Sequence, residues 1–134
     1  MSERDWIVYP YQHVFGIVDE DAAADAAVKG ILDAGVPEED ITVLTGESGA
    51  ARIDSHGSTH GMLGRVVRAL QFAMMDALPD SERYERAALD GKYVLAIRTR
   101  DDQTRDMVHQ ELLKHGGHFL NYYGKLTTQP LSEP

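Results

Sequence analysis

The segment His13–Val18 has the apolar, β-branched and aromatic residues that are typical of a short strand, and we expect it to be the first strand. Acidic residues follow it, and a side-chain oxygen of Asp19 or Asp21 can cap the free N–H groups at the start of a helix. After them, apolar residues recur at the spacing of a helix with one buried face: Ala24, Ala27, Val28, Ile31 and Leu32. This pattern predicts a strand followed by a capped amphipathic helix.

The end of this helix and the next strand complete a first structural unit. Gly35 supplies a helix stop, and Pro37 prevents the helix from continuing. Residues 41–44 are again apolar and β-branched, which predicts a second strand. Two strands that flank one amphipathic helix form a βαβ unit, so we expect parallel strands joined by a right-handed crossover.

The helical period returns between Met62 and Leu78. Ten apolar residues of this segment cover one wide helix face: Met62, Leu63, Val66, Val67, Ala69, Leu70, Ala73, Met74, Ala77 and Leu78. A face of this width exceeds what one sheet contact needs, and we expect it to be buried on two sides, including a contact with a second subunit. Pro79 ends the helix, and a shorter helix is expected to follow through Ala88.

The last third of the chain repeats the strand–helix–strand order. Residues 93–97 form the clearest strand pattern in the sequence. Asp101 and Asp102 can cap a helix that the Gly116-Gly117 pair closes, and a final strand is expected over residues 118–123.

This element order predicts an α+β domain of the split βαβ (ferredoxin-like) kind. Such a domain has an antiparallel four-stranded sheet, and here a helical segment is inserted between the second and third strands. We divide the single domain, residues 1–134, into a first βαβ half (12–45), a long loop (45–61), inserted helices (61–90), a second half (92–124) and a polar tail (125–134).

Composition and charge narrow the classes of function. The 134 residues carry 22 acidic and 13 basic side chains, a net charge of −9, and no cysteine. Without cysteine, disulfides, thiolate catalysis and cysteine metal sites are excluded, which fits a cytoplasmic protein. The acidity disfavours nucleic acid, whose binding depends on neutralising phosphates. No signal sequence or membrane span is visible, so no membrane partner is expected.

Two parts of the chain resemble bacterial general stress proteins and related uncharacterised small α/β proteins. The first is residues 14–24, Val-Phe-Gly-Ile-Val-Asp-Glu-Asp-Ala-Ala-Ala, together with residues 34–44, Ala-Gly-Val-Pro-Glu-Glu-Asp-Ile-Thr-Val-Leu. The second is residues 93–124, with Asp-Asp opening a helix, His-Gly-Gly closing it and Tyr-Tyr-Gly after the last strand. The resemblance implies a bacterial cytoplasmic protein with a link to stress, and it supplies no catalytic residues.

The long loop carries the best cluster of candidate ligand-binding residues: Glu47, Arg52, Asp54, His56 and His60. Imidazoles beside a carboxylate suit Zn²⁺ or another divalent transition metal, so His56, His60 and Asp54 are the candidate metal ligands. The alternative is a solvated polar loop whose side chains cap the next helix, and the spacing is compatible with both interpretations.

Two further patterns have a functional and a structural interpretation. Residues 45–50, Thr-Gly-Glu-Ser-Gly-Ala, follow a strand as phosphate-binding loops do, but they lack the Gly-Lys-Ser/Thr ending, and Glu47 would repel a phosphate. His115 and His118 can converge with His109; the simpler interpretation is that His115 complements the helix dipole and His118 begins a strand.

No catalytic triad or nucleophile motif surrounds the serines near His56 and His60, so no catalytic residue is assigned. We therefore expect a non-enzymatic, stress-linked or regulatory protein that acts as a homodimer through protein or small-ligand binding. Self-association is expected to use the segment from Met62 to Leu78. The alternative is a small metal-dependent enzyme or metal-binding protein that uses Glu47, Asp54, His56 and His60.

Overall fold

The structure is a computed structural model, and it describes residues 12–46, 67–69, 81–123 and 128–131. Its strands are β1 (His13–Val18), β2 (Ile41–Thr45), β3 (Val67–Ala69), β4 (Tyr93–Arg98), β5 (His118–Tyr123) and β6 (Thr128–Pro130). Its helices are α1 (Asp21–Asp33), α4 (Ser81–Leu89) and α5 (Asp102–Lys114), with a short 3₁₀ turn at Glu38–Asp40. None of the helices in these described segments is long and apolar enough to cross a membrane.

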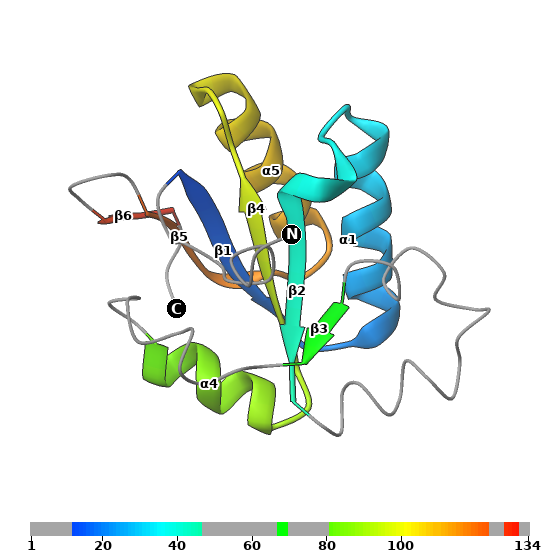
Figure 1. The fold of residues 1–134 in the computed structure, drawn as a ribbon, viewed down its shortest axis with the longest axis vertical. Helices are drawn as coiled ribbons and strands as arrows, with labels where there is room; N and C mark the ends of the chain where they lie inside the picture. Colours follow the sequence, from blue (N-terminus) through cyan, green and yellow to red (C-terminus); the bar gives the residue numbers. More distant parts are fainter. Residues whose placement is uncertain (1–11, 47–66, 70–80, 124–127, 132–134) are drawn as a thin grey trace, which may run out of the picture.

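The strands form one sheet in the order β3-β2-β4-β1-β5-β6 (Figure 1). Its centre is four antiparallel strands, β2, β4, β1 and β5, and β3 joins β2 in parallel. The predicted α+β class and the antiparallel four-stranded sheet are therefore confirmed. β1 and β2 run in the same direction with β4 between them, because each pairs with β4 in the antiparallel sense.

Helices α1 and α5 pack side by side against one face of the sheet (Figure 1). Successive strand residues point to opposite faces, so every second residue of β4 faces this layer, beginning with Tyr93 and continuing with Leu95 and Ile97. The helices contribute their predicted apolar positions, among them Ile31 and Leu112. This face holds the larger core of the domain.

Helix α4 lies on the opposite face of the sheet (Figure 1). The side chain of Tyr84 is fully buried there beside Phe15 and Tyr123, with ring centroids 5.3 Å and 6.4 Å away. The hydroxyl groups of Tyr84 and Tyr123 are hydrogen bonded at 2.8 Å, and the amide of Asn121 donates to the Tyr84 oxygen at 3.1 Å. These polar contacts attach α4 to β5 in one orientation.

The prediction of one continuous helix from Met62 to Leu78 is wrong at Val67–Ala69, which form the strand β3. The backbone of these residues pairs with β2 in the register Val43↔Val67 to Thr45↔Ala69. β-branched residues favour strands, and pairing with a neighbouring strand outweighed the helical spacing of the apolar residues. The other residues of this segment lie outside the described residues.

The predicted polar tail also contains regular structure. Residues Thr128–Pro130 form β6, which pairs with β5 in the register Asn121↔Pro130 to Tyr123↔Thr128. In the strand order β6 is the last strand. Proline has no N–H to donate to a neighbouring strand, and an edge strand tolerates this because it has a neighbour on one side only. The polar composition predicted a tail. Backbone pairing does not depend on apolar side chains, so polar residues can still form a strand.

Candidate functional site

Three ionisable residues come together at one end of the sheet, where Asp19 follows β1, Lys92 precedes β4 and His118 begins β5. β4 and β5 flank β1 on its two sides, and both run antiparallel to it. The end of β1 therefore lies between the beginnings of its two neighbours. This topology places the Asp19 carboxylate between a lysine and a histidine that are distant in the sequence.

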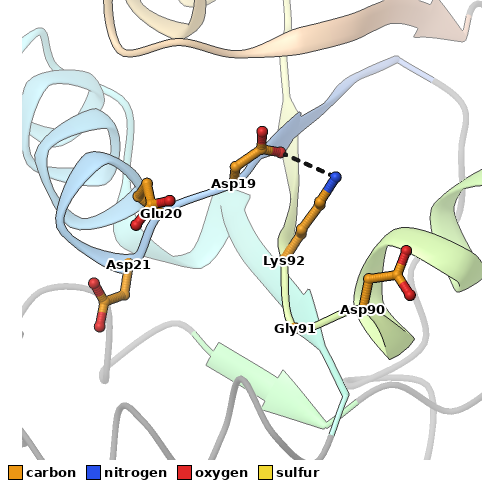
Figure 2. Close-up of a pocket in the computed structure, with 6 residues that line it drawn as sticks. All are labelled: Asp19, Glu20, Asp21, Asp90, Gly91 and Lys92. Atoms are coloured by element: carbon orange, nitrogen blue, oxygen red, sulfur yellow. Dashed lines mark ion pairs between the residues drawn. The ribbon is translucent and has the colours of Figure 1, made fainter.

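The carboxylate of Asp19 contacts both of these residues. Its Oδ1 lies 2.7 Å from Nε2 of His118. The same oxygen lies 3.7 Å from Nζ of Lys92 (Figure 2). The hydrogen bond with His118 is the main cause that holds the pKa of Asp19 below its ordinary value of 3.8, and Lys92 acts in the same direction. An ionised carboxylate can only accept, so Nε2 of His118 carries the hydrogen in this contact.

This role of Asp19 corrects the prediction that Asp19 or Asp21 caps the following helix. The N-cap residue of α1 is Glu20, and its side chain makes no capping hydrogen bond. The Asp19 side chain is directed to β4 and β5 instead. By contrast, the predicted cap of the last helix is confirmed, because the Asp101 side chain accepts a hydrogen bond from the Thr104 N–H at 2.7 Å.

Beside this cluster lies a hollow of about 510 Å³ that is open to solvent. It is lined by the start of α1 and by the turn between α4 and β4 (Figure 2): Asp19, Glu20, Asp21, Asp90, Gly91 and Lys92. Four carboxylates and one ammonium group give these residues a net charge of −3 at neutral pH. The hollow is therefore polar, and it is negatively charged.

An irregularity in β5 directly follows His118. Ile17 pairs with His118 but Phe15 pairs with Asn121, so β5 has one more residue than β1 over this stretch, which is a β-bulge. Phe119 takes up the extra residue with a φ of +51°, a left-handed conformation that is uncommon for a bulky side chain. Its ring lies 5.5 Å from the Tyr84 ring, and the Arg83 guanidinium stacks 4.2 Å from its centroid. These contacts hold the bulge.

The opposite end of the sheet carries a separate ion pair. Asp40 precedes β2 and Arg100 follows β4, and the guanidinium donates to both carboxylate oxygens at 3.1 Å and 3.2 Å. The Asp40 side chain is only 5% exposed, so the two hydrogen bonds satisfy a buried charge. This pair joins two strand ends and is a structural contact.

The sequence-predicted loop site lies outside the described residues, and all five of its candidates stay predictions: Glu47, Arg52, Asp54, His56 and His60. Within the described segments, no group of three or more histidine or acidic side chains lies close enough to hold a metal ion. Of the glycine-bearing stretch at residues 45–50, only Thr45 and Gly46 are described. The hydroxyl of Thr45 donates to the carbonyl of Lys92 at 2.9 Å. This hydrogen bond stabilises the backbone of Lys92, one of the residues that line the hollow.

The three C-terminal histidines take different positions. His115 is the C-cap residue of α5 and lies 3.4 Å from Glu111, while His118 begins β5 as the simpler interpretation expected. Nε2 of His109 is buried without a hydrogen-bond partner among the described residues. The structure therefore gives His115 and His118 separate acidic partners.

Sequence reasoning missed Asp19, Lys92 and His118 as one cluster. The available signal was positional, because each residue lies at the end of a predicted strand. Using it would have required the strand order, since only the placement of β1 between β4 and β5 makes the three residues neighbours.

Comparisons of this chain with models of protein families, with curated proteins and with solved structures found no match.

The lowered pKa of Asp19 predicts how the contribution of this residue to stability depends on pH. Because the folded protein favours the ionised form, Asp19 stabilises it above the ordinary pKa of 3.8, and this contribution is lost as the pH falls through the lower folded value. The side chain is 49% exposed, so we expect Asp19→Asn to cost at most about 1 kcal/mol at neutral pH. Urea unfolding of both proteins should show this difference shrinking below pH 3.8. A difference that grew in acid would contradict the assignment.

Proposed function

We propose that this chain is a non-enzymatic regulatory protein with a split βαβ (ferredoxin-like) domain, and that it binds a small ligand in the hollow beside Asp19. The order of its four central strands, β2-β4-β1-β5, supports the domain type, because each βαβ half then contributes one inner and one outer strand. The resemblance of residues 14–44 to general stress proteins supports a bacterial, cytoplasmic and stress-linked role.

The observation that carries the binding proposal is the hollow itself. Its volume of about 510 Å³ lies within the roughly 300–1,000 Å³ of ordinary ligand sites. Its walls come from the β1–α1 connection and from the α4–β4 turn, two segments about 70 residues apart that the sheet holds together. A ligand in the hollow would contact both halves of the domain.

The charges of the hollow favour a ligand that carries ammonium groups. Asp19 shares its charge with His118 and Lys92, whereas the side chains of Glu20 and Asp90 are exposed at the rim. A positive charge about 6 Å from a carboxylate gains roughly 0.7 kcal/mol in water. Several carboxylates around one hollow make this attraction additive, and they repel an anion by the same amount.

Three ligands of equal length provide the test: 1,4-diaminobutane, 1,4-butanediol and succinate. Isothermal titration calorimetry at low ionic strength should show binding of the diamine and none of the diol or the diacid. Asp90→Asn should weaken diamine binding about threefold, because one carboxylate at the rim is lost. Asp106→Asn is the matched control, since this carboxylate is exposed on α5 and does not line the hollow. Preferential binding of succinate, or equal binding of all three ligands, would refute the proposal.

We also propose that the protein acts as a homodimer through the segment from Met62 to Leu78. The support is the apolar content of this segment in the sequence and the position of β3 as the outermost strand beside β2 in the described sheet. An outermost strand has an unpaired row of backbone N–H and C=O groups that another chain can use.

A further inference from the structure

We infer that the contact between His118 and Asp19 makes ligand binding in the hollow sensitive to pH: a proton taken up by His118 weakens the binding of a cation. This inference rests on the proposed function, because it concerns the regulation of the same hollow. It requires that His118 be fixed against a wall of the hollow and that it be accessible to protons. It also requires that the charged His118 compete with a second cation for the carboxylate of Asp19.

The bulge at Phe119 and the ladder fix the histidine. His118 is paired with Ile17 in the β1–β5 ladder, and the next residue, Phe119, has a left-handed backbone at φ +51°. A glycine is the usual residue at this position of a bulge, since it adopts positive φ without steric cost. The Phe119 ring contacts the Tyr84 ring and the Arg83 guanidinium, and these contacts stabilise the bulge. A fixed backbone beside His118 holds its imidazole at 2.7 Å from Asp19.

The histidine is accessible to solvent protons. Its side chain is 36% exposed, and Nε2 is the nitrogen that contacts Asp19. Imidazole is the side chain whose ordinary pKa lies nearest to neutral pH, whereas carboxylates and lysines keep their charges there. A proton bound by His118 converts the present hydrogen bond into a charged ion pair with Asp19.

The competing cation is Lys92. A single carboxylate oxygen, Oδ1 of Asp19, serves both His118 at 2.7 Å and Lys92 at 3.7 Å. A charged imidazole holds this oxygen more strongly and leaves the ammonium group of Lys92 less neutralised on the wall of the hollow. The other charged groups that line the hollow are the carboxylates of Glu20, Asp21 and Asp90. Protonation of His118 thus adds a positive charge beside the hollow. It also leaves the positive charge of Lys92, on the wall of the hollow, less neutralised by Asp19.

The test compares diamine binding at about pH 7.5 and about pH 5.5, a range in which imidazole changes charge and carboxylates do not. We expect the wild-type protein to bind 1,4-diaminobutane about threefold more weakly at the lower pH, from one added charge about 6 Å away. His118→Gln keeps a hydrogen-bond donor but cannot become charged, so its affinity should be nearly the same at both pH values. His115→Gln is the control, because this histidine has Glu111 as its partner and should leave the pH effect unchanged. A pH effect that persists in His118→Gln would overturn the inference while leaving the proposed function intact.

A measurement without ligand separates this inference from the proposed function. In an NMR titration of the free protein, the carboxyl carbon of Asp19 and the Nζ protons of Lys92 should shift at the same midpoint as the ring protons of His118. His118→Gln should abolish both shifts above about pH 5. If the diamine fails to bind but these shifts occur together, the ligand assignment is wrong and the pH-sensitive contact stands. If Asp19 and Lys92 do not follow His118, the inference is wrong whatever binds in the hollow.

Discussion

Replacing Leu95 by alanine is expected to lower the free energy of unfolding by about 3 kcal/mol, a value within the range for buried leucines. Leu95 lies on β4 and is completely buried in the core that α1 and α5 cover. The alanine leaves a cavity there, because β4 is paired on both sides and its backbone cannot move to fill the space. Urea unfolding followed by circular dichroism gives the difference directly.

Leu113→Ala is the matched control for this prediction. Leu113 lies on α5, but its side chain is 42% exposed. Its removal from the surface should cost less than about 1 kcal/mol. Equal losses for the two leucines would contradict the arrangement in which α1 and α5 cover this face of the sheet.

Replacing Tyr84 by alanine is expected to cost about 4 kcal/mol, as for other large aromatic residues in a core. Tyr84 is the completely buried residue that attaches α4 to the second face of the sheet, where its ring packs against Phe15 and Phe119. Tyr84→Phe keeps this ring and removes only the hydroxyl. It should cost about 1–2 kcal/mol, because the hydrogen bonds to Tyr123 and Asn121 are lost.

The comparison with Arg86→Ala tests whether α4 is attached through its buried side. Arg86 is on the same helix and is exposed, so its removal should change stability by less than about 0.5 kcal/mol. The midpoint temperature of thermal unfolding should be lowest for Tyr84→Ala, higher for Tyr84→Phe and highest for Arg86→Ala. A stable Tyr84→Ala protein would mean that α4 does not pack on this face.

The elements that sequence patterns predicted well are those with a strong local period. The apolar spacing from Ala24 to Ile31 determines the buried face of α1, and these residues are buried as expected. Likewise, β4 corresponds to the predicted strand at residues 93–97. In both α1 and β4, the spacing of apolar side chains within the element predicts its structure, so this prediction does not depend on neighbouring elements.

The elements that were predicted wrongly depend on pairing between distant segments. Val67–Ala69 had the spacing of a helix but pair with β2, and Thr128–Pro130 appeared polar but pair with β5. Backbone hydrogen bonds to a neighbouring strand stabilise such short segments, and this partner is invisible in a local pattern. The same limit applies to Asp19, which served as a helix cap in the prediction because Lys92 and His118 are 73 and 99 residues away in the sequence.

The central claim, a cation-binding hollow where β1 ends and β4 begins, is tested most directly by NMR mapping of the ligand. In ¹⁵N-labelled protein titrated with 1,4-diaminobutane, the amide shifts should concentrate at residues 19–21 and 90–92. Asp40 and Arg100, at the opposite end of the sheet, should not move. Shifts spread evenly over the acidic surface, or centred away from these two segments, would contradict the account.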